Sequence, residues 1–76
     1  MAIELELPRA QPVSAVIYDI RGRRVRTLAA GPRGAGKWQL QWHGEGDDGA
    51  RRGAGVYLFR LEAADGRSTQ RFVWLP

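Results

Sequence analysis

The stretch that most constrains this chain runs from Gly55 to Gly66, because it begins at a glycine, continues through aromatic and branched residues, and ends in Asp-Gly. Apolar side chains recur there at every second position. One face would carry Tyr57, Phe59, Leu61 and Ala63, and the opposite face Leu58, Arg60 and Glu62. A period of two with one wholly apolar face is typical of a β-strand that covers a core. Asp65-Gly66 predicts a tight hairpin, and residues 70–75 supply the returning strand.

Four further segments are predicted strands: residues 2–7, 13–20, 24–29 and 37–42. Between the second and third of these segments, residues 19–23 predict a turn, with Gly22 at a position where a positive φ is needed. Residues 31–36 are rich in Gly and Pro and predict a loop. No segment shows sustained helical periodicity. Short strands separated by regularly spaced turns predict an all-β fold, a sandwich or a barrel.

The predicted core is drawn from alternating positions of these strands. It contains Leu5, Leu7, Val13, Ile17, Val25, Trp38, Leu40, Trp42, Tyr57, Phe59, Leu61 and Val73. The chain has 76 residues and no cysteine, so we expect residues 1–76 to form one domain that no disulfide supplements. No apolar run approaches the roughly 20 residues of a membrane helix, and we expect no transmembrane segment.

The net charge of +4 comes almost entirely from arginine, and its excess lies in the first half of the chain. The residues that contribute most are Arg21, Arg23, Arg24 and Arg26. An arginine patch of this kind can hold phosphates or acidic glycans. The alternative is a solvated hairpin, which we favour because nucleic-acid binders carry a larger excess together with exposed aromatic residues. We therefore expect no nucleic-acid partner.

The longest irregular piece, residues 42–55, carries three carboxylates and His43. Clustered oxygens can bind a hard cation. The spacing differs from that of an EF-hand, however, and His43 has no His or Cys partner at zinc spacing. The alternative, which we favour, is a polar turn in which Asp47 or Asp48 caps backbone amides beside Gly49. We expect no metal and no cofactor here.

The hydroxyl side chains give no indication of catalysis. Those considered are Ser14, Thr27, Ser68 and Thr69. None has an evident pairing with a histidine and a carboxylate, which an activated nucleophile requires. We therefore predict that the chain is not an enzyme and has no catalytic residues.

Several longer motifs resemble those of a bacterial family. They are Leu5-Glu6-Leu7-Pro8-Arg9-Ala10, Val13-Ser14, the run from Ile17 to Leu28, Gly34-Ala35-Gly36, Trp42-His43-Gly44, Asp47 with Gly49, and the run from Gly55 to Leu61. Together, from Ile3 to Leu75, they are similar to the FlgD-type immunoglobulin-like domain and to the closely similar type A sorting domain of the type IX secretion system. The chain departs from the family at His43, where Asp is usual, and at Pro76, where sorting domains often end in a basic residue.

The resemblance implies a fibronectin-III-like, antiparallel β-sandwich of about six or seven strands that performs no chemistry. Such domains commonly lie at the C-terminal end of exported bacterial proteins, so the expected location is secreted or at the cell surface. The expected partners are upstream domains of a larger parent protein and the outer-membrane secretion machinery, which recognises sorting domains. The alternative is a structural spacer or assembly domain, as in the flagellar hook cap.

The motif residues of the family also have structural roles that we expect here. They are Asp19, Gly22, Trp42, Gly44, Gly49, Gly55 and Tyr57. Tyr57 is expected to bond a backbone group through its hydroxyl, as in the tyrosine corner of sandwich domains. Asp19 is expected to hold the amides of its turn, and Gly22 and Gly55 to lie where the backbone turns sharply. Trp42 is expected to close the core beside Trp38.

Overall fold

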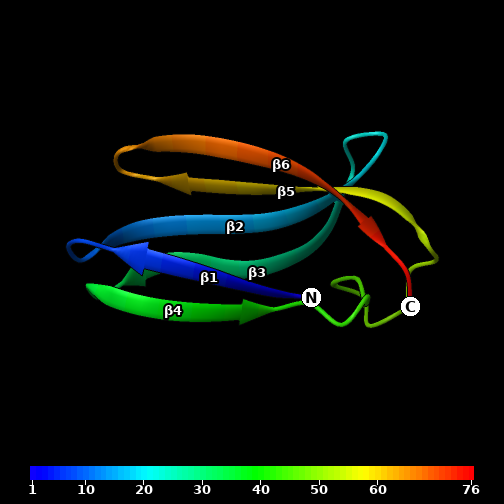
Figure 1. Ribbon diagram of the computed structural model, residues 1–76, viewed down its shortest axis with the longest axis horizontal. Helices are drawn as coiled ribbons and strands as arrows, with labels where there is room; N and C mark the ends of the chain where they lie inside the picture. Colours follow the sequence, from blue (N-terminus) through cyan, green and yellow to red (C-terminus); the bar gives the residue numbers. More distant parts are fainter.

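The computed structural model describes all residues, 1–76, and consists of strands and connecting turns (Figure 1). The strands are β1 (Ala2–Leu7), β2 (Gln11–Asp19), β3 (Arg24–Arg33), β4 (Gly36–Gln41), β5 (Gly55–Ala63) and β6 (Gly66–Trp74). All pairings are antiparallel, in a two-stranded sheet β1-β4 and a four-stranded sheet of order β3-β2-β5-β6. This architecture confirms the predicted antiparallel β-sandwich. No helix long and apolar enough to cross a membrane is found.

The core lies between the two sheets and is centred on β2 and β5, the inner strands of the larger sheet. Its members are Leu5, Leu7, Val13, Ala15, Ile17, Val25, Ala29, Leu40, Trp42, Tyr57 and Phe59. The alternation expected for β5 is confirmed, because Tyr57 and Phe59 are buried while Glu62 is exposed. Leu61 is only partly buried and packs against the edge of the core.

Two residues of the predicted core, Trp38 and Val73, are exposed, at 37% and 64% respectively. Val73 lies opposite Val56, whereas its neighbour Phe72 lies opposite the buried Tyr57. Because directly opposite residues share a face of the sheet, Phe72 points inward and Val73 outward. The prediction for β6 was therefore wrong by one position.

Trp38 lies on β4 at the edge of the smaller sheet, opposite Leu5. Its indole N–H donates a hydrogen bond of 2.9 Å to the carbonyl oxygen of Gly34. The guanidinium of Arg33 lies over its ring at 5.6 Å from the centroid. The amphipathic indole is thus held at the rim by a polar contact and a cation–π contact rather than inside the core.

The strand β3 continues through the first half of the segment that was predicted to be a loop, residues 31–33. Its pairing with β2 runs through Val13↔Gly31 and Pro12↔Pro32 to Gln11↔Arg33, so only Gly34 and Ala35 connect β3 to β4. Proline is tolerated here because β3 is an edge strand and loses no ladder bond on its solvent side. The loop prediction for residues 31–33 was therefore wrong.

The hairpin between β5 and β6 turns one residue earlier than predicted. Ala63 pairs with Gly66, so Ala64 and Asp65 form the connection and β6 begins at Gly66, well before residue 70. No residue other than glycine has a positive φ, and Gly66 takes φ 141°. The glycine thus follows the turn, where it lets the chain enter β6.

Candidate functional site

The β4–β5 loop (residues 42–54) contains the candidate metal ligands, and it folds back on itself. The amide of Arg52 donates a hydrogen bond of 2.7 Å to the carbonyl oxygen of Gly44. The indole N–H of Trp42 donates one of 2.7 Å to the carbonyl oxygen of Glu45. These bonds close the loop with main-chain groups as partners, so it is a compact turn rather than an open arc.

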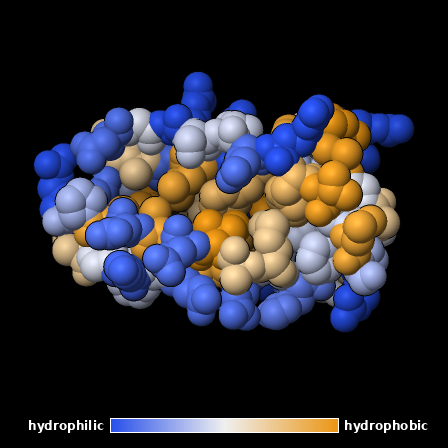
Figure 2. All heavy atoms as spheres, viewed as in Figure 1, coloured by the Kyte–Doolittle hydropathy of each residue, from blue (hydrophilic) through white to orange (hydrophobic).

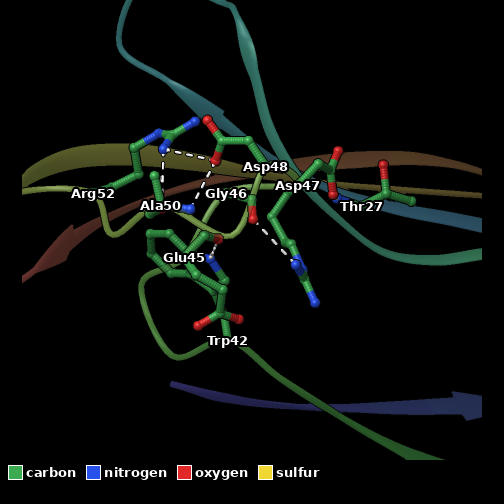
Figure 3. Close-up of polar contacts among 9 residues, drawn as sticks. Thr27, Trp42, Glu45, Gly46, Asp47, Asp48, Ala50 and Arg52 are labelled. Atoms are coloured by element: carbon green, nitrogen blue, oxygen red, sulfur yellow. Dashed lines mark hydrogen bonds and ion pairs between the residues drawn. The ribbon is translucent and has the colours of Figure 1, made fainter.

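The same loop is anchored on β3, twenty residues earlier in the sequence (Figure 3). The amide of Asp47 donates to the carbonyl oxygen of Val25 at 2.8 Å, and its carboxylate accepts the amide of Thr27 at 3.0 Å. The guanidinium of Arg26 donates to the carbonyl oxygen of Gly46 at 3.2 Å. Asp47 therefore extends the hydrogen bonding of the exposed edge of β3, which blunts that edge.

The second carboxylate of the loop, Asp48, caps the loop itself. Its Oδ1 accepts the amide of Ala50 at 3.0 Å and forms an ion pair of 3.3 Å with Arg52 (Figure 3). The hydrogen bond from the Ala50 amide, followed by that from Arg52, lowers the pKa of Asp48 below its usual value of 3.8. This is the cap that we expected beside Gly49, which has φ 81°.

No group of three or more His, Cys, Asp or Glu side chains is placed to hold a metal ion. Asp47 and Asp48 accept hydrogen bonds from protein amides, and His43 lies exposed without a hydrogen bond from its ring. The loop carboxylates thus serve the turn. That the chain needs no metal stays a prediction.

The fully buried Trp42 is the centre of an aromatic cluster, called here the Trp42 cluster (Trp42, Tyr57, Phe72 and Trp74). Its ring centroid lies 5.1 Å from that of Tyr57, 5.8 Å from that of Phe72 and 5.0 Å from that of Trp74. The first two contacts are edge-to-face, a favourable geometry for aromatic pairs. The expected neighbour Trp38 is not part of this cluster, so that expectation was wrong.

The motif glycine Gly44 is required by the Trp42 cluster. It takes φ 85°, and a Cβ at this position would lie 2.8 Å from ring atoms of Trp74. Both the backbone conformation and the close approach of the indole therefore exclude a side chain. The indole nitrogen of Trp74 is buried here and has no hydrogen-bond partner.

The hydroxyl of Tyr57 donates a hydrogen bond of 2.7 Å to the carbonyl oxygen of Gly53, the backbone partner that the sequence led us to expect. The expectation for Gly55 was wrong. Gly55 is the first residue of β5 and has no positive φ, and a Cβ there would only touch Tyr57 at 4.0 Å. The tyrosine therefore joins the end of the β4–β5 loop to the core without a sharp turn at Gly55.

The turn between β2 and β3 is held by Asp19 as expected. Its Oδ1 accepts the amides of Arg21 and Arg23, both at 2.9 Å, and its Oδ2 accepts the side chain of Arg23 at 2.9 Å. These hydrogen bonds lower the pKa of Asp19 below its usual value of 3.8. The amide of Arg23 contributes most, followed by the Arg23 side chain and the amide of Arg21. Gly22 takes φ 83°, which confirms its predicted role.

The four arginines of the possible anion site do not converge. Arg21 and Arg23 line a shallow hollow of about 240 Å³ beside Tyr57, and Arg23 is also paired with Asp19. Arg24 and Arg26 lie along β3 and do not line this hollow, and Arg26 is bonded to the β4–β5 loop. Binding of an anionic ligand by these four arginines stays a prediction. The separation of Arg24 and Arg26 from the hollow gives it no further support.

One buried polar residue was missed by the sequence analysis. Gln11 is only 6% exposed, and its amide group donates to the carbonyl oxygen of Arg9 and accepts the amide of Ala64 at 3.0 Å. It therefore clamps the β1–β2 turn to the β5–β6 hairpin. A glutamine between Ala10 and Pro12 carries no pattern that distinguishes this role from an exposed position.

Comparison with known proteins places the fold in a family. A search of curated proteins found no match, and a search of solved structures found none. The family model described as the FlgD Ig-like domain matches residues 1–67, which include the turn at Asp19, the β4–β5 loop and Tyr57. Because the family model matches most of its length, and because it folds as an antiparallel sandwich, the chain belongs to the FlgD Ig-like domain family.

Proposed function

We propose that this chain is a non-catalytic module of an exported bacterial protein that serves secretion sorting or cell-surface anchoring. The observation that carries the proposal is that the side chains of its family motifs make contacts within the domain itself. Asp19 holds its turn, Trp42 fills the core, and Asp47 accepts the amide of Thr27. A domain whose polar groups are engaged in this way offers surfaces for recognition rather than a reaction centre.

The proposal includes the partners and the location expected from the resemblance. The module would be attached to upstream domains of a larger parent protein, and its surface would be recognised by outer-membrane secretion machinery. It would act outside the cytoplasm, in a secreted or surface-exposed protein, and without a cofactor or nucleic acid.

A structural spacer or assembly domain is the second candidate, and the observation that favours it is the family itself. The matching family model carries the name of FlgD, and the resemblance relates such domains to the flagellar hook cap. A spacer needs only a stable sandwich and two attachment points. Position separates the two roles, because a sorting signal is expected to act at the C-terminal end and a spacer at any position.

The test is fusion of residues 1–76 to a periplasmic reporter in a bacterium that has the type IX system. We expect the reporter to reach the cell surface or medium when the domain is at its C-terminus. It should stay in the periplasm when the domain is inserted upstream of the reporter. A known sorting domain is the positive control. If only that control delivers the reporter, the sorting role is wrong and the spacer role replaces it.

A further inference from the structure

The two layers of the sandwich are unequal, and the smaller layer ends in an unpaired strand. The smaller sheet contains only β1 and β4, so β1 has a partner on one side. β4 contacts β3, at one edge of the larger sheet, and β1 lies between β4 and the larger sheet in the view of Figure 1. The start of β1 shares a hollow with Phe59 of β5 and Phe72 of β6, so its free edge begins beside the inner faces of these strands.

One hollow lies beside the start of this free edge, and a second lies at the β5–β6 hairpin. The first, of about 210 Å³, lies between the start of β1, including Ile3, and the side chains of Phe59 and Phe72. The second, of about 250 Å³, is lined by Leu61 and Ala63 together with Asp65, Gly66, Arg67 and Ser68, and no residue of β1 lines it. Figure 2 shows apolar atoms gathered along the middle of this face, between hydrophilic rims. A strip of inner-face apolar surface is thus left without a covering strand.

We propose that the free edge of β1 is a strand-addition site for an extended segment of another protein chain. The segment would pair with β1 through main-chain hydrogen bonds and place alternate side chains over Phe59 and Leu61. β1 has six residues, so it can pair with a segment of that length, about 20 Å at the usual rise per residue. The inward side chains of this segment should be apolar.

The charges on the outer side of β1 define the rest of the segment. Glu4 and Glu6 alternate with the inward Leu5, are exposed, and form no ion pair, although Lys37 lies opposite Glu6. Side chains directly opposite on neighbouring strands lie about 4.5–5.5 Å apart. Outward side chains of an added strand would therefore contact these carboxylates and should be basic. Arg71, which lines the first hollow, belongs to the other sheet and forms no ion pair with either glutamate.

A second copy of the chain is a poorer occupant. Pairing of β1 with β1 would bring glutamates opposite glutamates, which is destabilising. The β6 strand of a second copy carries Arg67 and Arg71 and would match the charge. Of its inner side chains, Ser68 and Gln70 are polar, and Phe72 already packs in the Trp42 cluster of its own copy, so the apolar surface beside β1 would stay unfilled. Charge and apolar surface together thus point to a segment that alternates apolar and basic residues.

The experiment titrates the labelled domain with seven-residue peptides and follows the amide signals by NMR. One peptide alternates valine with lysine, a second alternates valine with glutamate, and a third has proline at the centre of the first. We expect the lysine peptide to bind about tenfold more tightly than the glutamate peptide. This order opposes the net charge of +4, which would favour the acidic peptide. Shifts should be confined to β1 and the inner faces of β5 and β6, and proline should abolish binding.

Reversing the charges on β1 gives a sharper test than the peptides alone. Replacing Glu4→Lys and Glu6→Lys should reverse the preference, so that the glutamate peptide binds better, with the melting temperature little changed. Glu62→Lys, at an exposed position on the outer face of β5, is the matched control and should leave the order unchanged. Absence of binding by either peptide, or no reversal in the double variant, overturns the proposal. If sedimentation shows a dimer, and the β1 amides are protected from exchange in that dimer, the edge binds a second copy of the chain. That result also overturns the proposal.

Discussion

The hydroxyl of Tyr57 lies 2.7 Å from the carbonyl oxygen of Gly53 and donates a hydrogen bond to it. This bond joins the last part of the β4–β5 loop to β5, four residues later in the sequence. The ring of the same tyrosine packs against Trp42 in the core. Tyr57 therefore links the polar loop and the apolar interior through one side chain.

Removing this hydroxyl should weaken the fold by a measurable amount. Tyr57→Phe keeps the ring but leaves the Gly53 carbonyl without its partner, so we expect a loss of about 1 kcal/mol in the free energy of unfolding. Tyr18→Phe is the matched control, since the Tyr18 hydroxyl makes no hydrogen bond and its ring lies under Arg60. Urea denaturation measures both. Equal effects of the two substitutions would show that the Tyr57 bond contributes nothing particular.

The tryptophans provide a second test, because two of them differ in burial. Trp42→Ala removes a fully buried ring and should cost about 3–5 kcal/mol, which approaches the whole stability of a small domain. Trp42→Phe, which should cost less, keeps the measurement possible if the alanine variant does not fold. Trp38→Ala, at the exposed rim, should cost far less than Trp42→Ala. Similar losses at the two positions would contradict the described core.

Stability should fall in acid through Asp19 and Asp48. Hydrogen bonds from backbone amides, with Arg23 and Arg52, lower the pKa of each carboxyl below 3.8 in the folded chain. A carboxyl with a depressed pKa contributes stability above its unfolded pKa and loses it as the pH falls through the folded value. The melting temperature should therefore decline from about pH 4 downward.

Replacing either aspartate by asparagine should make this decline shallower, because one titrating group is removed. Glu62→Gln, an exposed residue that makes no hydrogen bond or ion pair, is the control. Calorimetry between pH 2 and pH 6 measures the effect. An identical slope in the asparagine variants and the parent would show that these carboxylates do not couple folding to pH.

A chelator should leave the melting temperature unchanged, because the loop carboxylates serve as acceptors for backbone amides. A metal that bound only the folded chain would raise its stability by mass action, and its removal would lower the transition. Calorimetry with and without EDTA tests this prediction. A decrease of several degrees on chelation would mean that Asp47 or Asp48 holds an ion.

The local patterns in the sequence were sufficient where one strand or turn determines its own structure. The alternation of β5, the turn at Asp19 and the cap at Asp48 all follow from residues close to one another in the chain. Such features depend on side-chain period and on short-range hydrogen bonds, which the sequence displays directly.

The failures involve relations between distant segments. Trp38 alternates correctly with Leu40, but only the packing of the sheets shows that its end of β4 lies at the rim. The continuation of β3 through Gly31 and Pro32 depends on β2 starting at Gln11. The anchoring of Asp47 on Thr27 likewise joins residues twenty positions apart. Local propensity contains no information on these pairings.

The β4–β5 loop belongs to the fold rather than forming an open ligand site, and amide hydrogen exchange distinguishes these two arrangements. The amide of Asp47 is bonded to Val25, and that of Thr27 to the Asp47 carboxylate. We predict that both amides exchange as slowly as those in the paired strands. If both amides exchanged at the rate of an open loop while the strand amides stayed protected, the β4–β5 loop would not be part of the fold.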